Sequence, residues 1–230
     1  MLPDLSVVSH LNAGTVIVDG AAVLILVGMI IHTSLYRSRG RLDDKLFFAM
    51  LITDLVAAVC DGCNYLLENS TDPPAARLIM IGDTVFSAAF VLFSLLFALF
   101  VYYRAHHDSE RIRKNWLYYA LPAFLSFAMI LGNLFAGYMF YVDENTVYHY
   151  GDWYDLIFVA PALYGVLCIV NIWRIDKRLV FLFLVMIAIR IGGGIFARGI
   201  STTPIVFAVW LAFIHILTMN HPFYGEEESV

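Results

Sequence analysis

Residues 179–199 read LVFLFLVMIAIRIGGGIFARG, an apolar stretch with one arginine, Arg190, well inside it. A charged side chain at such a depth in hydrocarbon costs roughly 2.5 kcal/mol or more unless it meets a counter-charge or a wet cavity. Asp61 and Asp83 lie in other apolar stretches at similar depth and are the candidate partners. The stretch therefore predicts a membrane helix and an intramembrane charged site.

The whole chain has the composition of a polytopic membrane protein. Of its 230 residues, 61% are hydrophobic and 14% are charged, and the mean hydropathy is +0.78. A soluble domain of this length does not need so much apolar surface. No basic patch is dense enough to indicate nucleic-acid binding. The first residues lack the positive charge of a secretory signal peptide, so we expect the first helix to remain in the protein.

Seven apolar segments are long enough to cross about 30 Å of hydrocarbon as helices. They lie at residues 14–36, 46–67, 78–103, 116–142, 153–173, 179–198 and 203–219. The connections between them are short, which favours antiparallel neighbours. We therefore predict an all-α polytopic membrane protein, a single domain over residues 1–230 that forms a seven-transmembrane helix bundle.

The basic residues predict the orientation of this bundle. The first, third and fifth connections and their flanks hold eleven of the 14 lysines and arginines. Because positive charge accumulates in cytoplasmic loops, we expect these connections inside the cell. The N-terminus is then outside and the C-terminus is cytoplasmic, and the expected location is the cell (plasma) membrane.

Polar side chains from several helices gather in the half of the bundle that is predicted to face outward. The candidate ligand-binding residues are Arg190, Asp61, Asp83, Asn64, Ser87 and Asn133. Two interpretations stay open: a small binding pocket anchored by Arg190, or a static ion pair that fixes helix packing. Asp19 is expected to extend toward the interface, and Asp54 has no basic residue at its own depth.

The sequence predicts no catalytic centre, metal site or cofactor. The last span has no lysine for a retinal Schiff base. His32 and His215 could meet on adjacent helices, but Asp54 is the single candidate for a third metal ligand. Cys60 and Cys63 lie in a membrane helix with no second cysteine pair, and we interpret them as packing residues.

The connection between the fourth and fifth segments predicts a lid over the polar site. FYV at 140–142 and VYHY at 147–150 are prone to form strands on either side of a polar turn. A short outer hairpin is therefore expected. Its Asp143, Glu144 and His149 are candidate lid residues, or else ordinary solvated loop residues.

The stretch around this loop also resembles a known family. Residues 138–166 read YMFYVDENTVYHYGDWYDLIFVAPALYGV, and residues 140–145, 147–149 and Gly151 carry the likeness. They are similar to a signature of seven-helix input modules that precede diguanylate cyclase (GGDEF) or histidine kinase domains in Gram-positive bacterial signalling proteins. The segment at 43–67 fits as well, whereas Tyr150 stands where a basic residue is expected.

The resemblance implies a sensor that binds an unknown small ligand outside and signals to a fused or associated cytoplasmic output domain. That domain is expected beyond residue 230, so the chain is expected to be an isolated module without enzyme activity of its own, and two-headed outputs favour a homodimer. One alternative is a small ion-coupled transporter in which Asp54 and Asp61 carry protons. Another is a scaffold whose buried charges are purely structural.

Overall fold

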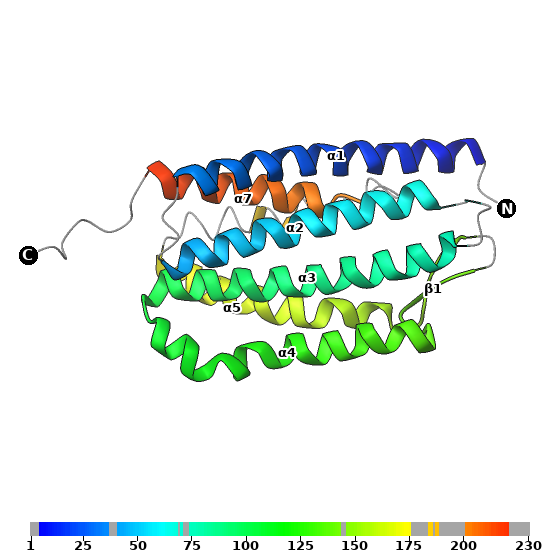
Figure 1. Cartoon of the computed structure of the whole chain (residues 1–230). Coiled ribbons are helices and arrows are strands. Elements are labelled where there is room, and N and C mark those ends of the chain that lie inside the picture. The colour runs from blue at the N-terminus through cyan, green and yellow to red at the C-terminus, as the bar shows by residue number, and fades with distance from the viewer. Residues whose placement is uncertain are drawn as a thin grey trace, which may run out of the picture.

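Helices account for nearly all regular structure in the computed structural model of the chain (Figure 1). The structure describes residues 5–36, 41–68, 70, 74–143, 146–175, 184–185, 187–188 and 201–220. The long helices are α1 (Leu5–Tyr36), α2 (Leu42–Leu67), α3 (Ala75–His106), α4 (Ser109–Ala136), α5 (Val159–Ile175) and α7 (Thr203–Asn220). The shorter elements are β1 (Phe140–Val142), β2 (Tyr148–Tyr150) and the 3-10 helix η1 (Tyr154–Phe158).

Among the described residues, five helical segments are long and apolar enough to span a membrane, which confirms an all-α, polytopic membrane architecture. They are Ala13–Leu35, Leu42–Leu67, Ala75–His106, Ser109–Ala136 and Tyr154–Trp173. A shorter apolar helix covers Thr203–Ile216, within the last predicted span. The span predicted at 179–198 falls outside the described residues, except for four helical residues at 184–185 and 187–188.

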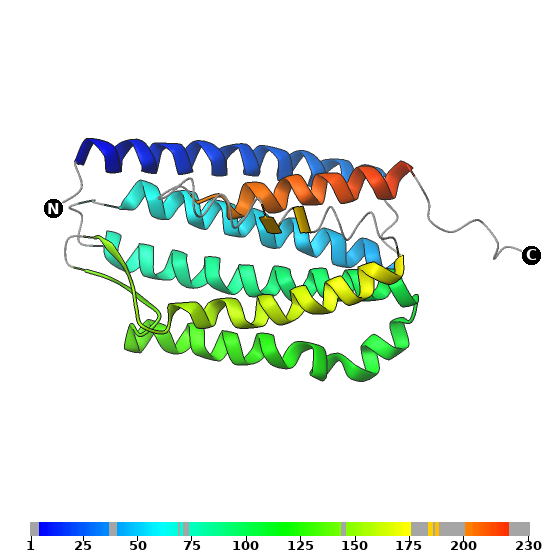
Figure 2. The same cartoon turned by 180° about the vertical axis from the view of Figure 1, so that it is seen from behind.

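The helices lie side by side with their long axes aligned (Figures 1 and 2). α2 and α3 are the central pair, because α1 and α7 pack on α2 while α4 and α5 pack on α3. The start of α1 and the end of α7 lie at opposite ends of the bundle (Figure 1). Large apolar side chains cover the outside, including Phe135 at 92% exposure and Leu24 at 76%. In water such a surface would be very unfavourable, whereas lipid solvates it.

Two predicted helix boundaries are wrong, and local backbone chemistry explains both. α4 covers Ser109–Ala136 instead of 116–142, because Asp108 caps its start by accepting a hydrogen bond from Arg111 N at 2.7 Å. Gly137, at φ 61°, ends the helix in the left-handed conformation that glycine favours. The residues at 140–142, placed in the helix by hydropathy alone, form β1 instead.

The predicted hairpin is confirmed. β1 and β2 pair antiparallel, with Phe140 opposite Tyr150 and Val142 opposite Tyr148. Asp143 shapes the turn, since its Oδ1 accepts a hydrogen bond from Val147 N at 2.9 Å. The hairpin therefore projects alternate side chains of β2 toward and away from the bundle.

A tyrosine compensates for the proline inside α4. Pro122 has no amide hydrogen and disrupts the helical hydrogen-bond ladder around it, and α4 bends in its first half (Figure 1). The Tyr164 hydroxyl of α5 donates to Tyr119 O at 2.7 Å and accepts from Ala123 N at 3.1 Å. It thus bridges the carbonyl and amide that a straight helix would join directly, and holds α5 against the bend.

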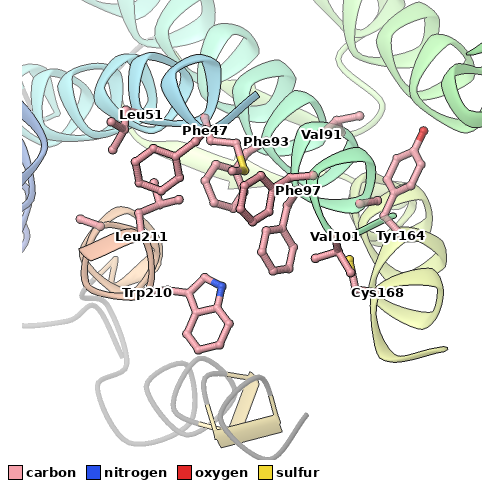
Figure 3. Packing of buried hydrophobic residues seen from close by; sticks show 14 of the residues in the cluster. Phe47, Leu51, Val91, Phe93, Phe97, Val101, Tyr164, Cys168, Trp210 and Leu211 are labelled. Atoms are coloured by element: carbon pink, nitrogen blue, oxygen red, sulfur yellow. The ribbon is translucent and has the colours of Figure 1, made fainter. Parts of the chain in front are cut away.

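The core between α2, α3 and α7 is rich in aromatic side chains (Figure 3). Phe93 stacks on Phe207 with ring centroids 4.3 Å apart, and Phe97 meets Trp210 edge-on at 6.3 Å. Such ring pairs add roughly 0.5–1.5 kcal/mol each beyond simple burial. They join α3 to α7 in the middle of the bundle.

Candidate functional site

Four aspartates from three neighbouring helices form the polar centre of the bundle. This carboxylate cluster consists of Asp19 on α1, Asp54 and Asp61 on α2, and Asp83 on α3. Asp19 is 2% exposed, Asp54 1% and Asp61 5%. Asp19 lies within electrostatic range of both Asp54 and Asp61, and Asp61 lies within range of Asp83. Buried carboxyl groups need hydrogen bonds, counter-charges or protons, so the partners of each residue decide what the cluster can do.

Asp83 is held by a side-chain amide from the neighbouring helix. Asn64 Nδ2 donates a hydrogen bond to Asp83 Oδ1 at 3.0 Å. Gly82 makes this contact possible, because a Cβ at that position would collide with the Asn64 amide. The other carboxylate oxygen, Asp83 Oδ2, is buried without a hydrogen-bond partner among the described residues.

The hairpin reaches the cluster through Tyr148 of β2. Its hydroxyl approaches the Asp83 carboxyl closely enough to act as a hydrogen-bond donor. Burial, together with the nearby Asp83 charge, raises the pKa of the Tyr148 phenol. The phenol therefore keeps its proton at neutral pH and remains a donor to the carboxylate.

Asp19 and Asp54 have unused hydrogen-bonding capacity. Neither oxygen of either carboxyl group has a hydrogen-bond partner within the described part of the chain. Asp19 lies over Gly62 of α2, where an added Cβ would sit 3.5 Å from Asp19 Cβ and 3.6 Å from its Oδ2. The absent side chain at Gly62 thus brings the Asp19 carboxyl group next to Asp61.

The sequence interpretation of Asp19 as an interfacial residue is wrong. Thr15, Asp19, Ala22 and Leu26 repeat at helical spacing and are all buried, so Asp19 belongs to the packed stripe of α1. This stripe is visible in the sequence as small residues flanking the acid and could have identified it. Tyr148 was missed because nothing local indicates that a strand residue turns toward a helix.

The structure brings together some of the predicted site residues and separates others. Asp61, Asp83 and Asn64 lie together, and Ser87 is buried one turn from Asp83 on α3. Asn133 is engaged elsewhere: its Nδ2 donates to Phe140 O at 2.9 Å and its Oδ1 accepts from Met139 N at 2.6 Å. It therefore anchors the start of β1.

The other predicted lid residues serve the hairpin itself. His149 Nε2 lies 3.2 Å from Asp143 Oδ2, and Asp143 also binds the turn amide of Val147. The Thr146 hydroxyl donates to Ser70 O at 2.9 Å and ties the hairpin to the connection between α2 and α3. Glu144 and Arg190 lie outside the described residues.

The opposite end of the bundle has polar contacts of another kind. Asp43 of α2 lies 3.2 Å from Arg104 Nη1 and 3.3 Å from Arg41 Nε. His32 and His215, for which the sequence left a meeting on adjacent helices open, lie together, with His215 Nε2 and His32 Nδ1 3.0 Å apart. No group of three metal-ligating side chains occurs within the described residues.

The fold and this polar centre define the chain as a polytopic helical membrane protein whose described part holds buried carboxyl groups with unsatisfied oxygens, near a hairpin at one end of the bundle. Comparison with models of protein families, with curated proteins and with solved structures gives no match. The residues of the site therefore carry the functional argument.

Proposed function

We propose that this chain is a membrane-embedded sensory module that binds a small ligand at the carboxylate cluster beneath the hairpin. A change there would pass through α7 to a cytoplasmic output domain. The observation that carries the proposal is the contact between Tyr148 and Asp83, because it joins an extramembrane element directly to the buried cluster. A ligand that competes for Asp83 displaces Tyr148 and so moves the hairpin.

An unbroken series of aromatic contacts from the hairpin to α7 supports signal transmission. Successive ring centroids in this aromatic chain are 4.3 to 6.4 Å apart. Its members, in order of contact, are Tyr148, Tyr150, Tyr154, Phe158, Phe90, Phe207, Phe93, Phe97 and Trp210. Close-packed rings transmit displacement because an interior has little free volume. Because contact alone does not establish energetic coupling, the aromatic chain calls for a direct test.

The topology of the proposed sensor has seven spans, with the hairpin outside the cell. The distribution of basic residues supports this orientation in the plasma membrane. The start of α1 and the end of α7 at opposite ends of the bundle agree with an odd number of crossings (Figure 2). In this proposal the apolar segment predicted at 179–198, which carries Arg190, is the remaining one of the seven spans.

The resemblance of residues 138–166 supports the kind of output in the proposal. A diguanylate cyclase or histidine kinase domain, fused or associated, would receive the signal, and a homodimer would suit either output. In this scheme the chain itself is the sensor, and the output domain carries the catalytic activity.

Hydrogen–deuterium exchange on the full chain in lipid nanodiscs tests the sensor function. Propylammonium, propionate and glycerol serve as cationic, anionic and neutral probes. We expect at least one probe to change exchange at residues 139–151 and, in the same sample, at residues 207–216. The Phe207→Leu variant should keep the first response and weaken the second, because leucine loses the ring contacts that Phe207 makes with Phe90 and Phe93.

A matched variant controls for general effects on the bundle. Tyr118→Phe alters a side chain that is 79% exposed on α4 and lies outside the aromatic chain, so both responses should persist. A response confined to the hairpin, or an absence of response to every probe, would contradict the sensor function.

Asp54 favours a second candidate function, an ion-coupled transporter. It lies seven residues from Asp61, about 10 Å deeper along α2 at roughly 1.5 Å per residue, and is 1% exposed with neither oxygen hydrogen-bonded among the described residues. Two buried carboxyl groups at different depths suit stepwise proton movement. Uptake of a probe into proteoliposomes that is lost in Asp54→Asn would support transport and contradict the sensor.

A further inference from the structure

We infer that the ligand of the carboxylate cluster is a small organic cation whose ammonium group binds among the carboxyl groups of the cluster. This inference rests on the proposed function and names the chemical class that the same site would take. Three independent features of the described residues lead to it: the charge balance, the unused acceptor atoms and the aromatic side chains beside them.

The charge balance of α1, α2 and α3 favours a cation. These helices contribute four carboxyl groups to the cluster. Every lysine and arginine of the same three helices, namely Lys45, Arg77 and Arg104, lies within about one turn of a helix end. Arg190 could neutralise a single carboxylate wherever it lies, so the cluster has an acidic excess. A bound cation compensates whatever part of that excess protonation leaves charged, and its attraction to a carboxylate is strong in a medium of low dielectric constant.

The unused acceptor atoms match the donors of an ammonium group. Both oxygens of Asp19, at 2% exposure, and Asp83 Oδ2 have no hydrogen-bond partner among the described residues. An ammonium group has three N–H donors and no acceptor. Bound at Asp19 or at Asp83 Oδ2, it would supply the missing donors without disturbing the bond from Asn64 Nδ2 to Asp83 Oδ1. A carboxylate ligand would instead add more acceptors to a site that lacks donors.

Aromatic side chains favour an organic cation over a metal ion. Tyr148 reaches Asp83 from the hairpin, and Tyr65 lies within electrostatic range of both Asp61 and Asp83. Tyr150 packs edge-on against Tyr148 with ring centroids 5.1 Å apart. Tyrosine faces attract alkylammonium groups through cation–π contacts and cover their carbon atoms, whereas a hydrated metal ion gains little from them.

Thermal unfolding of the full chain in detergent tests the inference, with propylammonium chloride as the probe. Sodium propionate of the same size and sodium chloride at equal ionic strength are the comparison salts. We expect propylammonium alone to raise the unfolding temperature in a saturable manner. Asp19→Asn and Asp83→Asn should each raise its apparent Kd about tenfold, which corresponds to the loss of one charge-assisted hydrogen bond.

The control variant is Glu110→Gln, which removes an exposed acidic charge at the far end of α4 and should leave the apparent Kd unchanged. The comparison of salts on the parent chain remains decisive if an aspartate variant does not fold. Equal shifts with sodium chloride would indicate an inorganic cation, and equal shifts with propionate would indicate no charge preference. Either result overturns the inference, as does unchanged affinity in folded Asp19→Asn and Asp83→Asn.

The failures of the two proposals are distinguishable. If propionate or glycerol moves both the hairpin and α7 in hydrogen exchange, the sensor function stands and the cationic ligand is wrong. If propylammonium binds in the manner expected but is taken up faster by proteoliposomes than by protein-free vesicles, and this excess uptake is lost in Asp54→Asn, the ligand class stands and the sensor function is wrong.

Discussion

Buried aspartates in the centre of the bundle and at the end opposite the hairpin have different surroundings. Asp43, far from the hairpin, is 2% exposed and pairs with Arg104 and Arg41 at 3.2 and 3.3 Å. Asp19 and Asp54 are equally buried, but neither has a hydrogen-bonded oxygen among the described residues. A paired carboxylate fixes the position of helices, whereas an unpaired one retains the capacity to bind a cation or a proton. Asp43 therefore has the surroundings of a structural ion pair, whereas Asp19 and Asp54 have those expected of a binding site.

The largest expected effect is the loss of the structural pair. Asp43→Ala should lower the free energy of unfolding by about 3 kcal/mol, because the Arg104 side chain, only 14% exposed, loses its carboxylate partner. Arg41→Ala is the matched control. Its side chain is 55% exposed, so the cost should be below about 1 kcal/mol. Equal losses of unfolding free energy for Asp43→Ala and Arg41→Ala in detergent would contradict this prediction.

Asn133 tests whether the hairpin is held as firmly as the opposite end. Asn133→Leu removes the bonds to Phe140 O and Met139 N and leaves both backbone groups buried. We expect a loss of about 2 kcal/mol, with faster hydrogen exchange confined to residues 138–151. Normal exchange in that segment would show that the hairpin does not depend on this amide.

Asp54 should respond with the opposite sign from Asp43. Asp54→Leu removes a buried carboxyl group without hydrogen-bond partners among the described residues and should raise the free energy of unfolding by about 1.5 kcal/mol. Asp43→Leu should lower it. The unfolding free energies of Asp54→Leu and Asp43→Leu should be measured under the same conditions. A loss of stability in both variants would contradict the difference between the paired and the unpaired aspartate.

Tyr148→Phe removes the phenol that meets Asp83 and should cost about 1 kcal/mol. The raised pKa of the folded Tyr148 phenol also predicts a pH effect. Above pH 10.0, the usual pKa of tyrosine, the folded state binds more protons than the unfolded state. The contribution of the phenol is therefore complete below that pH and declines as the pH rises above it. Unfolding measured from pH 8 upward should show a smaller alkaline loss for Tyr148→Phe than for the parent.

The smallest expected effect is that of the histidine pair between α1 and α7. His32→Phe removes one partner of the bond at 3.0 Å and should cost about 0.6 kcal/mol, the typical value for a polar contact between membrane helices. A double-mutant cycle with His215→Phe isolates this term. A coupling above 2 kcal/mol would place the pair among the principal determinants of the fold.

Hydropathy correctly predicted the helical membrane architecture because lipid permits few alternatives to the helix. It also predicted the proximity of Asp61, Asp83 and Asn64, since helical spacing and depth are readable along the chain. It misplaced the end of the fourth helix, because the apolar residues at 140–142 satisfy a hydropathy window equally well as strand or helix. Gly137 was the local signal for that boundary.

The amino-acid sequence by itself determined that the chain consists of long apolar membrane helices and that acidic groups must be buried among them, because both follow from the transfer of side chains out of water. Tertiary structure alone decided which acidic groups are paired. Asp43 meets Arg104 across 61 residues of chain, and Tyr148 of the hairpin reaches Asp83 of α3. Such partners depend on how helices pack and where a loop folds back, and no local pattern specifies them.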